Sequence, residues 1–124
     1  MIAKHELRIG NLITEKSLGM SRIIELRYDH CGVDGIDLAY KCSYEEIEPI
    51  PLSPELLVKC GFERMPLSSV TRYRDTATLF FIQTRNKKDW YVYGYKYYPA
   101  PIHSLHQLQN LYYSICQNEL QIIL

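Results

Sequence analysis

The stretch 104–117 constrains the fold most, because it is the one segment whose apolar residues keep a helical period. Ser104 and Gln107 have the spacing of a capping box at its start. A helix with a single apolar stripe is unstable alone in water and needs a sheet to pack on. We therefore expect an amphipathic helix over 105–117, packed across a sheet. The residues that share its apolar face are Leu105, Leu108, Leu111, Tyr112 and Ile115.

A second, shorter helix is predicted over 54–60. Ser53 is a good N-cap, and Pro54 fits the first helical position because its missing N–H would have no partner there. Gly61 is placed to end the helix. The residues of its short apolar stripe are Leu56, Leu57 and Cys60.

The first 48 residues contain three or four short extended runs separated by tight turns. Apolar and polar residues alternate over 21–28 and 33–40, and 41–48 continues extended. Turns are expected at 17–20 and 29–32, where glycine and polar residues gather. This pattern favours a small curled antiparallel sheet, and an SH3-like arrangement fits it.

The second half of the chain predicts a tyrosine-rich β-hairpin. Residues 76–84 are the most β-prone run, 85–89 form a polar loop, and 90–98 return as the antiparallel partner. Residues 64–70 are interpreted as a loop. Residues 119–124, after a left-handed stop at Asn118, are interpreted as a closing strand. Together the elements predict a single α+β domain spanning 1–124.

Length and charge limit the classes of protein that this chain can belong to. At 124 residues it can bury a core without disulfides. The 14 basic and 14 acidic residues cancel, so no overall field attracts nucleic acid or a membrane surface. No apolar run is long enough to cross a bilayer, and the N-terminus lacks the apolar segment of a signal peptide. We therefore expect a cytoplasmic protein.

No motif in the chain points to an enzyme or to a cofactor. There is no G-x-S-x-G, no P-loop and no dinucleotide fingerprint. The four cysteines are widely spaced without a CxxC, which favours buried reduced thiols over disulfides or a metal site. His103 and His106 are three residues apart, but no third metal ligand is indicated.

The tyrosine-rich hairpin is the candidate binding site. Between Thr71 and Pro99, six basic residues stand against two acidic ones, a local excess of four positive charges. In the return strand, the tyrosines at 91, 93, 95 and 97 share one face, whereas Trp90 and Val92 lie on the other. Tyrosines flanked by Arg and Lys can stack bases and hold phosphates. The alternative is that one face packs under the long helix, while tyrosines crowd the other because they favour strands. The candidate ligand-binding residues are Arg72, Arg74, Arg85, Lys87, Lys88, Trp90, Tyr91, Tyr93, Tyr95, Lys96 and Tyr97.

Three segments of the chain resemble a known family. They are the opening LRIGN (7–11), the middle segment YEEIEPIPLSPELLVKCGFE (44–63), and HQLQNLY (106–112), followed by the dipeptide EL at 119–120. The chain resembles a family of small uncharacterised proteins of Bacteroides-type bacteria and of their phages and mobile elements. The resemblance implies a phage or mobile-element setting, and it assigns no activity and no catalytic residue.

Two functions therefore stay open. The first is a non-catalytic binding protein whose basic aromatic hairpin contacts a nucleotide or a short nucleic acid. One version of it is an anti-defence protein that sequesters a host nucleotide signal and forms a homo-oligomer. The second is a protein–protein adaptor or inhibitor that uses the Tyr/Trp-rich face as its contact patch, since Tyr, Trp and Arg are the residues enriched at such interfaces.

Overall fold

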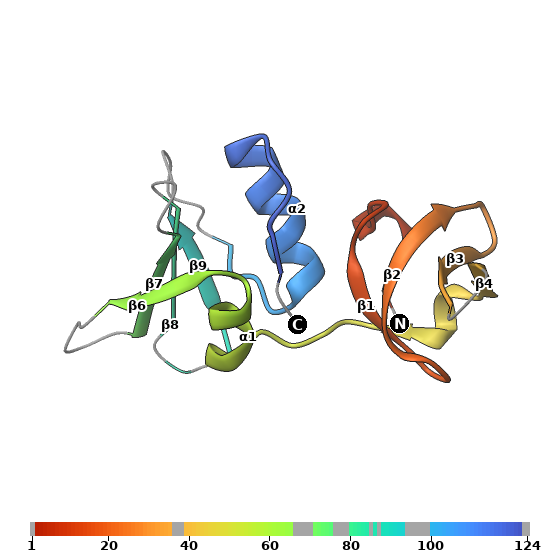
Figure 1. Cartoon of the computed structure of the whole chain (residues 1–124), viewed down its shortest axis with the longest axis horizontal. Helices are drawn as coiled ribbons and strands as arrows, with labels where there is room; N and C mark the ends of the chain where they lie inside the picture. The colour runs from red at the N-terminus through yellow and green to blue at the C-terminus, as the bar shows by residue number, and fades with distance from the viewer. Residues whose placement is uncertain are drawn as a thin grey trace. The chain divides into compact units, whose positions relative to one another are not determined.

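The chain folds into two antiparallel sheets and two α-helices. A computed structural model describes residues 2–35, 39–65, 71–75, 80–84, 86, 88–93 and 100–122. The strands are β1 (Leu12–Glu15), β2 (Gly19–Leu26), β3 (Cys31–Asp34), β4 (Ala39–Cys42), β5 (Ile47–Glu48), β6 (Phe62–Met65), β7 (Thr71–Asp75), β8 (Phe81–Thr84) and β9 (Trp90–Tyr93). The helices are α1 (Pro54–Lys59) and α2 (Leu105–Cys116), with 3₁₀ turns η1 (Lys4–Glu6) and η2 (Tyr44–Glu46). The predicted α+β class is therefore confirmed (Figure 1).

The chain divides into two compact units. The first comprises residues 1–50 and 104–110, and the second comprises 51–103 and 111–124. Helix α2 therefore contributes its first half to one unit and its second half to the other. The interpretation of the whole chain as a single domain stays a prediction.

The first unit contains a five-stranded antiparallel sheet with the strand order β4-β3-β2-β1-β5. The first four strands form a meander, and the short β5 returns to pair with β1 directly after η2. The tight turns before β1 and β2 use Gly10 and Gly19, which have positive φ values of 100° and 78°. This connectivity agrees with the expected SH3-like arrangement of the N-terminal part.

One strand boundary differs from the prediction. The run 33–40 was expected to be one strand, but β3 and β4 are separate antiparallel partners, with Asp34 opposite Ala39. The alternation of apolar and polar residues continues across the reversal, so the pattern alone does not show it. Likewise, 41–48 is not continuously extended, because Ser43 and Glu46 form a capping box that begins η2.

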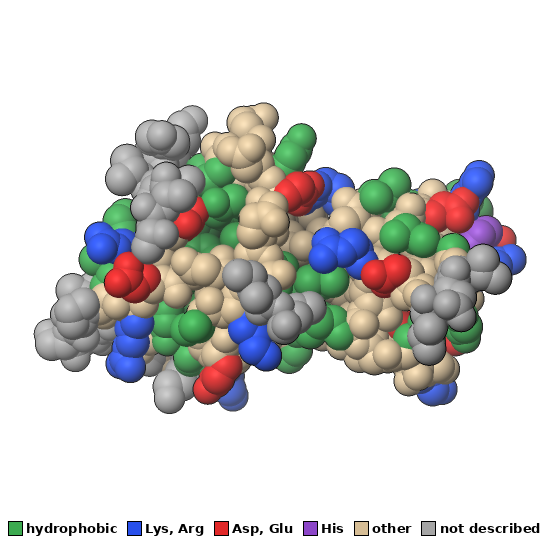
Figure 2. Space-filling model, in the orientation of Figure 1, with side chains coloured by type: hydrophobic (Ala, Val, Ile, Leu, Met, Phe, Trp, Pro, Cys, Tyr) green, Lys and Arg blue, Asp and Glu red, His purple; other side chains and the backbone are tan. Residues whose placement is uncertain are grey.

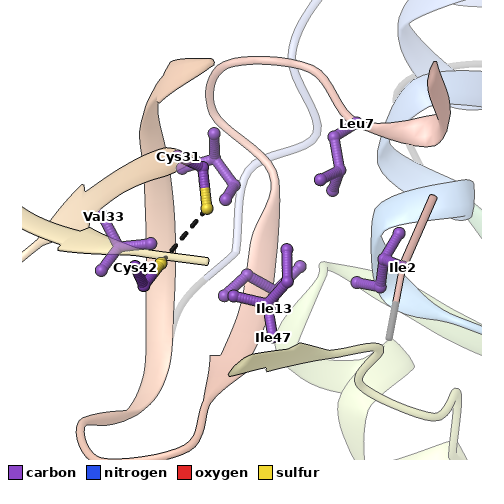
Figure 3. Packing of buried hydrophobic residues seen from close by; sticks show 8 residues of the cluster. Ile2, Leu7, Ile13, Cys31, Val33, Cys42 and Ile47 are labelled. Carbon is purple, nitrogen blue, oxygen red and sulfur yellow. Dashed lines mark hydrogen bonds between the residues drawn. The ribbon is translucent and has the colours of Figure 1, made fainter. Parts of the chain in front are cut away.

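The core of the first unit lies inside this curled sheet (Figure 3). Ile13, Ile23, Val33 and Ile47 are fully buried, and they come from four different strands. Cys31 and Cys42 lie directly opposite each other on β3 and β4 and point into the same core.

The first half of α2 is fixed to the turn before β1 by side-chain hydrogen bonds. The Gln109 side chain accepts from Leu12 N (2.8 Å) and donates to Gly10 O (3.1 Å). Asn110 Oδ1 accepts from Asn11 Nδ2 (2.8 Å), and Asn110 Nδ2 donates to Glu6 O (2.9 Å). Residues 6–12 and 109–110, far apart in the sequence, therefore meet in the first unit.

The second unit contains a four-stranded antiparallel meander with the strand order β6-β7-β8-β9. The predicted hairpin is confirmed for 81–84 and 90–93, since Thr84 pairs with Trp90 and 85–89 connects the two strands. Phe80 precedes the strand, and 76–79 and 94–98 of the prediction lie outside the described residues. Strand β6 reaches Met65, so the expected loop was wrong at 64–65, and 66–70 lies outside the described residues. Helix α1 packs beside β6 (Figure 1). From the second half of α2, Tyr112 packs on Phe80 at a ring distance of 5.1 Å.

Both predicted helices form, with small differences at their ends. Helix α1 ends at Lys59, one residue early; the Ser53 hydroxyl accepts from Leu56 N as expected, and Gly61 has a positive φ of 86°. Helix α2 ends at Cys116, and the left-handed residue is Gln117 (φ 59°) rather than Asn118. The closing strand was wrong for 119–122, which has no strand structure, and 123–124 lies outside the described residues.

The start of α2 forms the predicted bond from the Ser104 amide to the Gln107 side chain. Ser104 N donates to Gln107 Oε1 (3.2 Å), while the Ser104 hydroxyl lies 3.1 Å from His106 Nδ1. The first helical N–H, that of Leu105, donates to Ile50 O (2.8 Å), a backbone acceptor outside the helix. One of the otherwise unsatisfied amides of the helix start is thus paired with the chain that leads to α1.

Candidate functional site

Cross-strand register divides the second sheet into a buried face and an open face. One row across the sheet joins Met65, Arg72, Gln83 and Tyr91, and the next joins Glu63, Arg74, Phe81 and Tyr93. We call the two rows together the open face, because every described side chain in them is exposed or half-buried. The opposite face is core: Tyr73, Ile82, Thr84, Trp90 and Val92 are all 3 % exposed or less.

Arg72 is held in place over the open face. Its Nε donates to Gln83 Oε1 on the next strand (2.8 Å), and its guanidinium carbon lies 5.8 Å from the centre of the Phe81 ring. No acidic side chain among the described residues forms an ion pair with Arg72. The guanidinium is therefore positioned without being neutralised, which suits a group that receives an anion.

The Arg74 side chain is held less firmly than the Arg72 side chain. Its Nη2 lies 3.9 Å from Glu63 Oε2, and both side chains are more than half exposed. A pair of this kind is worth little in free energy because solvent screens it. In the view of Figure 2, basic and acidic side chains are interspersed over β6 and β7 rather than gathered into one continuous basic patch.

A hollow of about 210 Å³ lies at the loop end of β8 and β9. It is lined by Gln83, Thr84, Asn86, Asp89 and Tyr91. Asn86 organises the loop, since its Oδ1 accepts from the backbone amides of Lys88 and Asp89 at 3.0 and 2.9 Å. The Thr84 hydroxyl donates to Asp89 O (2.8 Å). Such side-chain bonds to nearby backbone groups hold a turn in one conformation.

Asp89 is a fixed negative charge at the edge of the hollow. Its Oδ2 accepts from Asn86 Nδ2 (3.1 Å), and its Oδ1 lies 2.8 Å from His103 Nε2. These two hydrogen bonds, that of Asn86 first, lower the pKa of Asp89 below its usual value. The carboxylate is consequently ionised at neutral pH.

The structure brings together only part of the predicted site. Arg72, Arg74 and Tyr91 share the open face, and the backbone of Tyr93 continues their row, although its side chain is not described. Lys88 is exposed in the loop. Trp90 is a correction to the candidate set, because its side chain is 1 % exposed in the core face and cannot stack on a ligand there. Five predicted residues lie outside the described part of the chain: Arg85, Lys87, Tyr95, Lys96 and Tyr97.

Sequence reasoning missed four residues of this region, Phe81, Gln83, Asn86 and Asp89. The hairpin register was the signal that would have found two of them. With a five-residue loop at 85–89, residues 81 and 83 fall opposite 93 and 91 and share their face. Asn86 and Asp89 carry no such signal, because their role depends on the conformation of the loop.

The cysteines and histidines do not form a second site. Cys31, Cys42 and Cys60 are buried, as predicted, and the sulfurs of Cys31 and Cys42 lie 3.2 Å apart (Figure 3). Burial raises the pKa of Cys42 and of Cys60 to about 12, so these thiols are protonated and poorly nucleophilic. His103 and His106 have different partners, Asp89 and Ser104. Within the described ranges, no group of three potential ligands could hold a metal ion.

The fold and the open face define a small α+β chain with an accessible, partly basic sheet surface. Comparison with protein-family models, with curated proteins and with solved structures finds no match to this chain. Among the described residues, no helix is long and apolar enough to cross a bilayer.

Proposed function

We propose that this chain is a non-catalytic binding protein whose open face takes a nucleotide or a short single-stranded nucleic acid. The observation that carries the proposal is the placement of Arg72, which is fixed by Gln83 and lies in one row with Tyr91. Arginine is the preferred partner of phosphate, and aromatic rings on a sheet are the usual platform for bases.

The charge distribution favours a small ligand over a duplex. The whole chain has no net charge, and Glu63 lies beside Arg74 on the same face. Binding to duplex DNA relies on many phosphate contacts, which the two arginines described on the open face, Arg72 and Arg74, do not supply. A mononucleotide, a cyclic dinucleotide or a strand of a few bases needs only one or two such contacts.

The resemblance implies a phage or mobile-element setting, and in that setting we propose a biological role for the binding. A cytoplasmic anti-defence protein would sequester a nucleotide that the host uses as a signal. Sequestration needs binding without chemistry, so it is compatible with a site whose described residues offer an arginine and aromatic rings. In this form the protein would act as a homo-oligomer.

The test is the salt dependence of binding. Affinity for nucleotides, cyclic dinucleotides and four-base oligonucleotides would be measured by calorimetry between about 50 and about 200 mM salt. We expect affinity to fall with salt, and Arg72→Ala to remove about one phosphate contact, a decrease of roughly 0.7 in the slope for a single strand. Lys59→Ala is the matched control, since Lys59 is an exposed cation of the same unit on α1.

Two results would contradict the proposal. If none of these ligands binds or raises the melting temperature, the open face is not a nucleotide site. If instead a protein partner binds through Tyr91 and Phe81 with little dependence on salt, the adaptor or inhibitor function is the correct one. Phe81 and Tyr91, both half-buried on the open face, are the observation that favours this second function.

A further inference from the structure

We propose that the hollow beside Asp89 is a nucleobase subsite that selects guanine. In this arrangement the Asp89 carboxylate accepts the two Watson–Crick donors of guanine, N1–H and N2–H, and the base lies against the Tyr91 ring. The inference rests on the proposed function, because it names the base that the nucleotide-binding face would recognise.

The size of the hollow sets how much of a nucleotide it can hold. Pockets that enclose a whole drug-sized ligand measure roughly 300–1,000 Å³. At about 210 Å³ this hollow is smaller, so it suits one flat ring system and not a complete nucleotide. The sugar and the phosphate would then lie outside it, on the open face.

Asp89 has acceptor capacity left for a ligand. A carboxylate offers about four lone-pair positions, two on each oxygen. One position on Oδ1 is used by His103 and one on Oδ2 by Asn86. Each oxygen therefore keeps a further acceptor position, and the two existing bonds hold the pair of oxygens in a fixed orientation.

The pattern of two adjacent acceptors matches one common base. Guanine presents two donors side by side, whereas adenine and cytosine place an acceptor ring nitrogen beside their amino group. Uracil and thymine present a single donor between two carbonyl oxygens. Against an ionised carboxylate, every base except guanine meets at least one repulsive contact between acceptors. The lowered pKa of Asp89 supports this pattern, because a protonated carboxyl would lose the discrimination.

The same negative charge decides where the phosphate lies. Asp89 repels an anion from the hollow, while Arg72 attracts one on β7. Gln83 of β8 lies between Arg72 and Tyr91 in the row, so two strand spacings, roughly 10 Å, separate β7 from β9. A guanosine phosphate would therefore span β8, with its base at Asp89 and its phosphate at Arg72. This chemistry is shared by free guanine nucleotides and by guanine within a short strand.

The experiment compares bases on the full chain. Binding of GMP, IMP, AMP, CMP and UMP, and of four-base strands with and without guanine, would be measured by calorimetry. We expect GMP to bind at least tenfold more tightly than AMP, CMP or UMP, and several-fold more tightly than IMP, which lacks the N2 amino group. Preference for the guanine strand over GMP would identify nucleic acid as the source, and the reverse would identify a free nucleotide.

The variant Asp89→Asn separates recognition from folding. Its amide offers one acceptor and one donor, so we expect it to lose the preference for GMP and to prefer XMP, whose base has a carbonyl at position 2. Glu63→Gln is the control, since Glu63 is an acid of the open face that does not line the hollow, and it should keep the preference for GMP. A gain of XMP binding cannot arise from misfolding.

Failure of this inference is distinguishable from failure of the proposed function. Equal, Arg72-dependent binding of all the nucleotides would overturn the guanine subsite and leave the nucleotide-binding face intact. Unchanged GMP preference in Asp89→Asn would also overturn it. Absence of binding by every nucleotide and strand would overturn both.

Discussion

Single polar side chains on α2 satisfy backbone hydrogen-bonding groups, which apolar side chains cannot do. Gln109 is 1 % exposed, and both ends of its amide are bonded to backbone groups around Gly10 and Leu12. The segment before β1 turns sharply and leaves these backbone groups without partners in a sheet ladder. The glutamine satisfies them, and in doing so it aligns α2 with the first strand.

This arrangement predicts a measurable cost for removing the amide. Gln109→Leu keeps the volume and the helix propensity but leaves Leu12 N unpaired in a buried place, while Gly10 O keeps only its bond from Arg22 Nη1 (3.1 Å). We expect a loss of about 1–3 kcal/mol in the free energy of unfolding, measured by urea denaturation followed by circular dichroism. Gln121→Leu, at an exposed position, is the control and should change stability by less than about 0.5 kcal/mol. Equal stability of the two variants would show that the amide bonds are not important.

At the scale of elements, the residues of the apolar stripe of α2 are buried to different extents. Leu105 and Leu108 are fully buried and Tyr112 is 8 % exposed, while Leu111 and Ile115 are half-buried. The helical period placed all five on one face, and it assigned them equal weight. The structure shows that the stripe is deepest at its N-terminal end.

Aspartate substitutions along the helix test this gradient. A carboxylate at Leu108 has no partner in the core, and its burial costs several kcal/mol, a large part of the roughly 5–15 kcal/mol that stabilises a typical domain. We expect Leu108→Asp to unfold the protein, Leu111→Asp to lower the melting temperature without abolishing folding, and Ser114→Asp, at an exposed position, to have little effect. Thermal melts followed at 222 nm measure all three. A reversed order for Leu108 and Leu111 would contradict the assigned burial.

For the whole molecule, the important feature is that both compact units depend on one helix. The first unit takes 104–110 from the end of the chain, and the second takes 111–124. Gln109 and Tyr112, only three residues apart, bond to β1 and to the end of β7 respectively, the latter through Asp75 Oδ2 (2.5 Å). A loss of α2 therefore removes core contacts from both sheets.

Truncation after His103 makes this dependence testable. The single tryptophan, Trp90, is buried in the second unit, so its emission reports on that unit alone. We expect the 1–103 chain to show red-shifted Trp90 emission and rapid hydrogen exchange at Ile13 of the first unit. A truncated chain with native emission and protected amides would show that each sheet is stable without the helix.

Local sequence signals were sufficient to predict the elements whose formation depends on residues nearby in the sequence. The Ser53–Pro54 start of α1, the period of α2 and the loop at 85–89 were predicted because capping, helical spacing and turn chemistry act over a few residues. The same alternation placed Tyr91 and Trp90 on opposite faces of β9. It could not tell which of those faces is buried.

The tertiary structure decided the rest. The reversal between β3 and β4, the return of β5 to β1 and the burial of Trp90 each depend on segments that are distant in sequence or on the packing of a whole face. So do the Gln109 bonds and the convergence of Arg72, Gln83 and Tyr91 in one row. Residue spacing determines which side chains can share a face, because backbone geometry is local. Only long-range pairing and burial determine which face is covered and which stays open to a ligand.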